Sequence, residues 1–247
     1  MAFDRLGEGP ALVLLHPLGA DRRVWDPILE HVAQEREVVA VDLPGFGDSP
    51  ALEQTPTPRA LAEAVAAFLA SQDLVRPHVA GNSLGGWVAL ELALAGHTRS
   101  ATAIAPAGLW SKPLMPKRGI ARRIARAALP LVDSLTASAA GRQVLLRGAV
   151  ARAERVPARA AAHLVRAYAT APGFRATNDA MRSSRFTALE RIRVPVTLLW
   201  GEHDRLVKPP PWLPPAVKSR VLRDAGHIPM WDVPEKLARI LIESTRV

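Results

Sequence analysis

The sequence predicts an α/β fold in which helices flank a mostly parallel central sheet, with a helical insertion in the middle of the chain. Apolar runs of strand length, such as residues 11–15 and 37–41, alternate with segments of helical periodicity. Such alternation implies crossover connections between parallel strands, with helices on both faces of the sheet. The alternation stops between residues 107 and 186, where the chain is rich in Arg and Ala and shows no convincing strand. We therefore expect an α/β core of residues 1–106 and 187–247 and a helical cap of residues 107–186.

The first half of the chain contains most of the expected core. Strand-length apolar runs occupy residues 11–15, 37–41, 77–80 and 100–105. Helical patterns occupy residues 24–34, 58–71 and 87–94, and the middle one has Thr57 at the N-cap position followed by Pro58. A loop rich in Gly and Pro follows the second strand at residues 42–50.

The last third of the chain completes the core after the insertion. Residues 194–200 and 220–223 have the pattern of two further strands. A closing helix is expected at residues 234–243, with Leu237, Ile240 and Leu241 on its apolar face.

The composition limits the chemistry that the chain can perform. The 247 residues are 49% hydrophobic and 22% charged, as in an ordinary globular protein. Cysteine is absent, which excludes disulfides, thiolate metal sites and cysteine nucleophiles. The chain shows no apolar signal segment and no run of about 18 apolar residues, so we expect a cytoplasmic protein without a membrane partner.

The most informative motif is Gly81-Asn82-Ser83-Leu84-Gly85-Gly86, which lies between a predicted strand and a predicted helix. This is the pattern Gly-x-Ser-x-Gly in the strand–turn–helix context of a nucleophile elbow, which exposes a serine hydroxyl at the N-terminus of a helix. The elbow needs a strained backbone at the serine and a close approach of strand and helix. A Cβ atom at position 81 or 85 is therefore expected to collide with its surroundings.

Four segments of the sequence occur in the order found in one enzyme family. They are His16-Pro17-Leu18-Gly19, the elbow motif, Gly201-Glu202-His203-Asp204 and Gly226-His227-Ile228-Pro229, and each follows a predicted strand. On these segments the chain resembles an α/β-hydrolase-fold serine hydrolase with a helical cap, from residue 12 to residue 242. Such relatives place two antiparallel strands before the first core strand. Residues 3–6 can supply only one of them, so we expect a sheet of seven strands.

The resemblance implies a catalytic triad. Ser83 would be the nucleophile, His227 the general base and Asp204 the acid that orients the histidine, in the chain order Ser, Asp, His of this fold. A serine hydroxyl is a weak nucleophile until a base takes its proton. Glu202 is the alternative acid if the loop is shifted in register. His31, His78, His97 and His163 have no motif around them and are expected at the surface or in structural positions.

The resemblance also implies an oxyanion hole made of backbone N–H groups. Leu84 follows the nucleophile and would donate one of them, and Leu18 would donate the second because the neighbouring Pro17 has no N–H. His16 is expected to shape this loop rather than to act as a base. Four residues are candidates for the walls of a substrate pocket, namely His16, Asn82, Trp110 and Trp231.

The identity of the nucleophile narrows the reaction. Dehalogenases and epoxide hydrolases of this fold carry Asp at the elbow, so Ser83 favours acyl transfer to water. The leading hypothesis is a hydrolase of carboxylic esters that forms an acyl-enzyme, without cofactor or metal. The alternatives are an enol-lactonase, a hydrolase of C–C bonds in ring-fission products, and an acyl-carrier-protein ester esterase. A ligand-binding protein on the same fold is the non-enzymatic alternative.

The positive charge is concentrated in the expected cap. Residues 107–188 contain 15 Lys and Arg but 3 Asp and Glu, a net +12, while the other 17 basic and 20 acidic residues give −3. A solvated helical face explains such a run, and a docking site for an acidic carrier protein is the sharper alternative. Helical spacing would then place Arg118, Arg122, Arg123 and Arg126 on one face. Since no aromatic residues interleave with these arginines, we expect no nucleic-acid partner.

Overall fold

A seven-stranded sheet forms the centre of the protein, with strand order β1-β3-β2-β4-β5-β6-β7. The computed structural model describes residues 1–115 and 119–246. Strand β1 pairs antiparallel with β3, and every other neighbouring pair is parallel. The expected fold class and the expected seven strands are therefore confirmed. The strands are β1 (Phe3–Leu6), β2 (Ala11–Leu15), β3 (Glu37–Val41), β4 (His78–Asn82), β5 (Ser100–Ile104), β6 (Val196–Gly201) and β7 (Lys218–Leu222).

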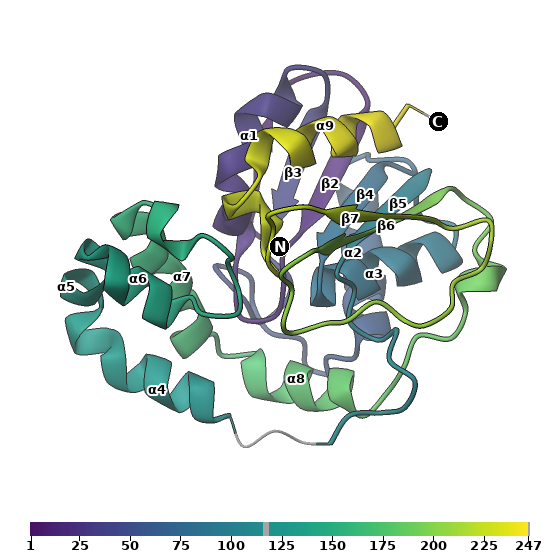
Figure 1. Cartoon of the computed structure of the whole chain (residues 1–247). Helices are drawn as coiled ribbons and strands as arrows, with labels where there is room; N and C mark the ends of the chain where they lie inside the picture. The colour runs from purple at the N-terminus through teal and green to yellow at the C-terminus, as the bar shows by residue number, and fades with distance from the viewer. Residues whose placement is uncertain (116–118, 247) are drawn as a thin grey trace.

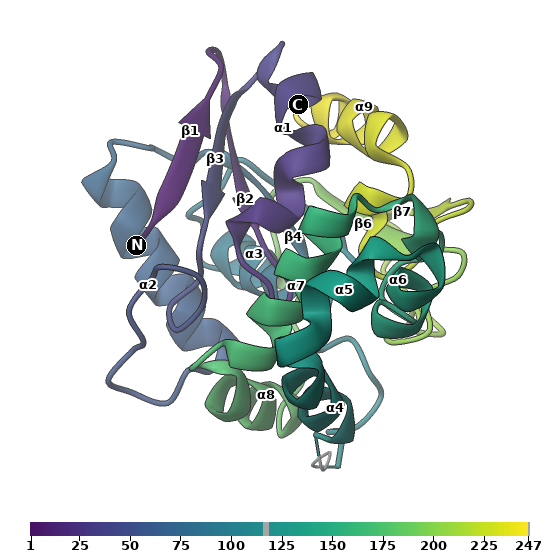
Figure 2. The ribbon, with the colours of Figure 1, turned by 90° about the vertical axis from the view of Figure 1, so that its left-hand side faces the viewer.

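Two layers of helices cover the sheet, as Figures 1 and 2 show. Alternate residues of a strand point to opposite faces. Leu12 and Leu14 of β2 accordingly pack in the cluster that includes the helices α1 (Asp26–Ala33) and α9 (Pro234–Ser244). Val13 and Leu15 pack in the cluster that includes α2 (Pro58–Ser71) and α3 (Leu84–Leu94). Both faces of the sheet are thus buried, which explains why the strands read as continuous apolar runs.

Local sequence patterns predicted the start of helix α2 correctly. The Thr57 hydroxyl accepts a hydrogen bond from the Ala60 N–H at 3.1 Å and caps α2, and Pro58 is its first residue, as predicted. The first helical segment differs from the expectation, because it begins as a 3₁₀ turn at Arg22–Trp25 before α1 starts. Asp21 is the N-cap of that turn and accepts from the Arg23 N–H.

The residues between β5 and β6 form helices, with no strand among those that the structure describes. The helices are α4 (Ile120–Ala128), α5 (Val132–Ala137), α6 (Ala139–Leu145), α7 (Ala158–Thr170) and α8 (Phe174–Arg182). This helical segment (residues 107–186) touches loops that follow strands. The Gly173 N–H donates to Gly45 after β3, and the Ile228 N–H after β7 donates to Ala149. The segment thus lies at the carboxyl edge of the sheet, where ligands of α/β folds bind.

Over residues 1–115 and 119–246, no helix has the length and apolar character needed to cross a bilayer.

Candidate active site

Ser83 lies at a sharp turn between strand β4 and helix α3. Its backbone has φ 54° and ψ −110°, in the left-handed half of the map that a serine rarely adopts. The turn is held by β5 and its following loop, since the Ser83 N–H donates to the Ile104 carbonyl at 2.8 Å and its carbonyl accepts from the Ala107 N–H at 3.0 Å. Such strain persists only where neighbouring contacts enforce it, and it marks functional sites.

Two glycines of the motif make this turn possible. A Cβ atom added to Gly81 would lie far inside contact distance of the Gly85 carbonyl. One added to Gly85 would overlap the carbonyl of Leu15 at the end of β2. The collisions expected at positions 81 and 85 are therefore present, and they bring the start of α3 against the end of the central strands.

His227 and Asp204 meet at the same edge of the sheet. The two residues follow β7 and β6, and the His227 Nδ1 lies 2.8 Å from Asp204 Oδ2. The other carboxylate oxygen accepts from the backbone N–H groups of Leu206 at 2.7 Å and Val207 at 3.0 Å. Glu202 accepts instead from the Asp224 N–H at 3.1 Å, so the structure brings Asp204 rather than Glu202 to the histidine.

The surroundings of Asp204 keep it ionised. Burial alone would raise its pKa, but the hydrogen bond and charge of His227, together with the two loop N–H groups, lower the pKa of Asp204 below its ordinary value. A carboxylate can only accept hydrogen bonds, so the proton of the His227 ring lies on Nδ1. The Nε2 atom is then left with a lone pair, as a general base requires.

Asn82 connects the serine turn to the histidine loop. Its side-chain Nδ2 donates to the main-chain carbonyls of Ile104 and His227, each at 3.0 Å. The residue before Ser83 is thus bound directly to the residue expected to act as base. Within the described residues the Ser83 hydroxyl makes no hydrogen bond, and Ser83 as a whole residue is 7% exposed.

The two expected oxyanion donors have N–H groups that are not used elsewhere. Leu84 is the first residue of α3, where a helix leaves its N–H without an intrahelical partner. The Leu18 N–H lies in the loop after β2, and neither N–H has a hydrogen-bond partner in the part of the chain that the structure describes.

His16 fixes the loop that carries Leu18. The Nδ1 of this fully buried ring donates to the Pro17 carbonyl at 2.8 Å, and Nε2 accepts from the Leu43 N–H at 2.9 Å. Burial lowers the pKa of His16, so the ring stays neutral and keeps both bonds. The loop after β2 is thereby tied to the loop after β3.

Two of the four candidate pocket residues are hydrogen-bonded to the main chain. His16 uses both ring nitrogens on main-chain partners, and Asn82 is fully buried with its amide nitrogen bound to two carbonyls. Their place in the wall of a pocket stays a prediction, and within the described residues the buried Oδ1 of Asn82 has no hydrogen-bond partner. Trp110 and Trp231 are partly buried. Trp110 stacks edge-to-face on Trp87 and donates to the Ser184 carbonyl at 2.9 Å.

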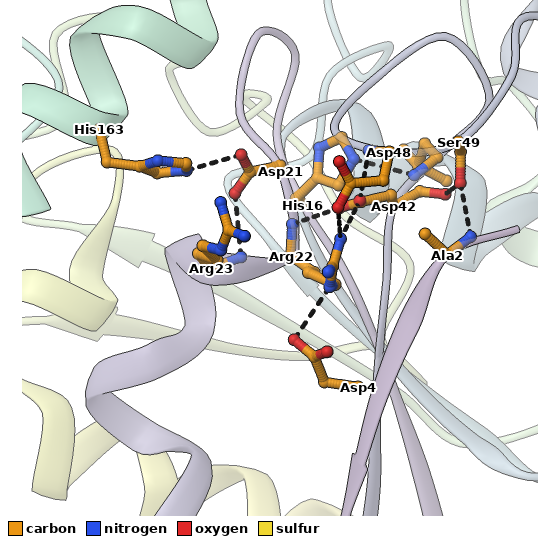
Figure 3. A network of polar contacts seen from close by, with 11 residues as sticks. Ala2, Asp4, His16, Asp21, Arg22, Arg23, Asp42, Asp48, Ser49 and His163 are labelled. Carbon is orange, nitrogen blue, oxygen red and sulfur yellow. Dashed lines mark hydrogen bonds and ion pairs between the residues drawn. The ribbon is translucent and has the colours of Figure 1, made fainter.

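A polar network not expected from the sequence binds the C-terminal end of the loop that carries Leu18 (Figure 3). Arg22 pairs with the fully buried Asp42, with Asp48 at 2.9 Å and with Asp4 at 2.9 Å. Neighbouring Asp21 binds Nε2 of His163 on α7 at 2.6 Å, which joins this loop to the helical segment. The pattern could not be found in the sequence because its members lie far apart in the chain.

Asp232, a second residue that the sequence did not point to, binds the backbone of the His227 loop. Its Oδ2 accepts from the Gly226 N–H at 2.8 Å and the Ala151 N–H at 3.0 Å, and Oδ1 accepts from the Arg152 N–H at 2.9 Å. One carboxylate thus joins the histidine loop to the helical segment.

Comparison with known families gives a match over nearly the whole chain. The model of the alpha/beta hydrolase family matches residues 12–240. The enol-lactonase of Burkholderia xenovorans LB400 superposes with a TM-score of 0.76 at 21% identity, over 98% of this chain and 95% of that one. At that identity the superposition shows a shared fold.

Two curated relatives match at higher identity. The pimeloyl-[acyl-carrier protein] methyl ester esterase of Aeromonas hydrophila is 47% identical over 95 residues, 38% of this chain and 36% of that protein. The matched segment thus spans about a third of that relative. Epoxide hydrolase EphH of Mycobacterium tuberculosis is 32% identical over 178 residues, 66% of this chain and 83% of that protein.

Proposed function

The chain belongs to the alpha/beta hydrolase family, and from this premise we propose that it hydrolyses carboxylic esters through an acyl-enzyme on Ser83. The observation that carries the proposal is the buried pair of His227 and Asp204, 2.8 Å apart, in a loop bonded to the residue before Ser83. A protein that only binds ligands has no need of this arrangement.

In the first half of the proposed reaction, Nε2 of His227 takes the proton of the Ser83 hydroxyl while its oxygen attacks the ester carbonyl carbon. The carbonyl oxygen becomes an oxyanion, which accepts hydrogen bonds from the N–H groups of Leu18 and Leu84. The tetrahedral intermediate collapses, the C–O bond to the alcohol breaks, and the alcohol leaves with the proton that His227 had taken. Asp204 stabilises the imidazolium during these steps.

In the second half, water repeats the attack on the acyl-enzyme. His227 takes a proton from the water, the oxyanion forms again in the same place, and the bond to Ser83 breaks as the serine recovers its proton. A carboxylic acid leaves. The reaction needs the Ser83 hydroxyl to rotate into hydrogen-bond distance of Nε2, a contact that such sites often tighten only when substrate is bound.

The serine bears on whether this chain opens epoxides, the reaction that the name of its relative EphH gives for that protein. In the family, epoxide hydrolases carry Asp at the elbow, because a carboxylate can open an epoxide and form an ester that water then cleaves. Ser83 stands at that position here. We therefore infer acyl transfer rather than epoxide opening, although the overall sequence match to EphH is the longer one.

A second candidate concerns the acyl group. The stronger local identity to a methyl ester esterase acting on a carrier-bound pimeloyl chain favours esters of small alcohols on long acyl chains. The docking of a carrier through Arg122 and Arg126 is less well supported, since both side chains bind main-chain carbonyls of the helical segment. We also propose that residues 107–186 act as a cap over the site, in keeping with their contacts at the carboxyl edge.

A substrate panel tests the proposal. Purified protein is assayed with p-nitrophenyl esters of increasing chain length, a methyl ester, an enol-lactone and a dienone ring-fission product. We expect turnover of the esters, which the Ser83→Ala variant lacks while its circular dichroism spectrum is unchanged. Turnover of the ring-fission product alone would replace the ester proposal with C–C bond hydrolysis, and a Ser83→Ala variant as active as the parent would reject Ser83 as nucleophile.

A further inference from the structure

Helix α4 (Ile120–Ala128) presents an apolar face to solvent, whereas an ordinary surface helix buries its apolar face. Two of its three arginines, Arg122 and Arg126, bind the neighbouring helix α7. The Arg122 side chain donates to the carbonyls of Tyr168 at 3.1 Å and Ala171 at 2.5 Å, and Arg126 donates to Ala169 at 2.8 Å. These carbonyls lie at the C-terminal end of α7, where a helix leaves its acceptors unpaired and its dipole favours positive charge.

The outward side of α4 is apolar. Ile120 is 63% exposed and Ile124, one turn later, is 61% exposed, while the inward Ala125 is buried. The exposed Ala127 and the 61%-exposed Leu131 continue the line at helical spacing. We call Ile120, Ile124, Ala127 and Leu131 the α4 stripe. In an ordinary surface helix these are the side chains that pack on the core.

The α4 stripe lies at the rim of the molecule. Figures 1 and 2 both show α4 on the outer side of α7, away from the sheet. Water therefore covers large apolar side chains on this edge, and a stripe of this kind marks an interaction surface.

Positive charge lies beside the stripe, on the exposed Arg123 and Arg126 of the same helix. Within the residues that the structure describes, none of Arg122, Arg123 and Arg126 pairs with a carboxylate, and Arg123 is exposed beside Ile124. Residues 107–188 carry 15 basic and 3 acidic residues. A second copy of the chain would bring the same excess of positive charge against this face, so self-association through it is opposed by repulsion.

We propose that the α4 stripe docks on an anionic lipid surface, with the isoleucines and Leu131 in the headgroup region and Arg123 against the lipid phosphates. A helix that combines an apolar face with flanking arginines and modest overall hydropathy lies flat in such an interface. A single row of exposed side chains fits a lipid surface better than a folded protein, which would need a groove to receive it. The docking is independent of the reaction proposed at Ser83.

Sedimentation with vesicles tests this inference. The protein is mixed with vesicles of phosphatidylcholine alone or with 30% phosphatidylglycerol as the anionic component, an experimental choice set by the need for a negative surface. We expect binding to the anionic vesicles that weakens as salt is added. Ile124→Glu should lower the partition coefficient about tenfold or more, because it puts a charge where an apolar side chain would enter the lipid headgroup region.

Matched variants make the outcome specific. Arg123→Glu should weaken binding to anionic vesicles, whereas Val75→Glu, which changes an 83%-exposed side chain outside the helical segment, should bind like the parent. All variants should retain the parent's ester turnover with a soluble substrate. Three results would overturn the inference: no binding to anionic vesicles, a dimer in light scattering that Ile124→Glu dissociates, or binding to an acidic carrier protein in the absence of any vesicle binding.

Discussion

At the scale of single residues, hydrogen bonds occupy most polar atoms of the candidate site and leave a few of them available for chemistry. Asp204 uses both carboxylate oxygens, on His227 and on two backbone N–H groups. His227 is left with one free ring nitrogen, and the N–H groups of Leu18 and Leu84 have no other partner among the described residues. What is available for chemistry is therefore one hydroxyl, one nitrogen lone pair and two N–H donors, which is the set that acyl transfer needs.

The Asp204→Asn variant tests the tautomer argument. The amide NH₂ would face Nδ1 of His227 and move the ring proton to Nε2, so the base would be lost while the geometry stays. We expect kcat to fall by about 10⁴-fold, the size of the effect when a triad acid is replaced by its amide. Steady-state kinetics with a p-nitrophenyl ester measures it. Glu202→Gln is the control and should stay within about twofold of the parent, so the opposite pattern would make Glu202 the acid.

The Gly85→Ala variant tests the tight turn. A Cβ atom there overlaps the Leu15 carbonyl, so we expect the free energy of unfolding to fall by about 3 kcal/mol, at the upper end for overpacking. At Gly86 the nearest atoms to an added Cβ are 3.1 Å away, and Ala favours a helix, so Gly86→Ala should cost less. Urea unfolding compares the two, and equal losses would show that the close approach at Gly85 is unimportant.

The sequence predicted the residues whose role depends on local pattern. The elbow glycines, the Thr57 cap and the order of Ser83, Asp204 and His227 follow from short motifs and from where predicted strands end. The expectation that His16 shapes its loop agrees with its hydrogen bonds. Its partner Leu43 and the bond from Asn82 to the His227 carbonyl were not predictable, because these main-chain groups come near only in the folded chain. Hydrogen bonds to distant backbone leave no trace in side-chain patterns.

At the scale of elements, loops that follow parallel strands are joined to one another and to the helical segment. His16 ties the loop after β2 to that after β3, Asn82 ties β4 to the His227 loop, and His163 ties α7 to Asp21. Most of these contacts are made by polar groups at one edge of the sheet. The site is thus positioned by bonds between elements rather than by any one loop.

The Asp232→Ala variant tests the support of the His227 loop. It leaves the N–H groups of Gly226, Ala151 and Arg152 without their acceptor, so we expect a loss of about 1–3 kcal/mol in the free energy of unfolding. Because Gly226 precedes His227, kcat should fall more than KM rises. Asp224→Asn is the control, since it removes only an exposed pair with Arg152. A fully active Asp232→Ala variant would contradict this role.

Helical spacing alone did not predict which way the arginines of the helical segment point. The spacing of Arg122, Arg123 and Arg126 predicted one basic face, and Arg118 of that set lies outside the described residues. The structure directs Arg122 and Arg126 to carbonyls at the end of α7. The alternative that these arginines face a carrier protein stays a prediction. Sequence patterns locate a side chain around its own helix but do not say which side another helix covers.

At the scale of the whole molecule, a histidine buried in the sheet makes the free energy of unfolding depend on pH. His78 of β4 lies among buried residues with its Nδ1 2.7 Å from the Ser100 hydroxyl of β5. Burial, together with the positive charges of Arg99 and Arg36, lowers the pKa of His78 from 6.5 to about 4. The unfolded chain therefore binds one more proton than the folded protein between these values.

It follows that the free energy of unfolding falls as pH falls from about 6.5 toward about 4, and that this loss is absent above pH 6.5. His78→Asn keeps a hydrogen-bonding group for Ser100 but cannot titrate, so its unfolding free energy should fall less over this window. Urea unfolding at a series of pH values gives the slopes. The exposed His97→Asn is the control and should have the parent's slope, and identical slopes in the parent and His78→Asn would contradict the assignment.

We propose that Ser83 becomes a nucleophile because His227 and Asp204 lie beside a strained turn, and a covalent probe tests this proposal most directly. The protein is incubated with a fluorophosphonate, and the site of the mass gain is located by peptide mass spectrometry. We predict one adduct, on Ser83, that forms rapidly in the parent and at least about a hundredfold more slowly in Asp204→Asn. No adduct, or an adduct on another serine that persists in Ser83→Ala, would contradict the account.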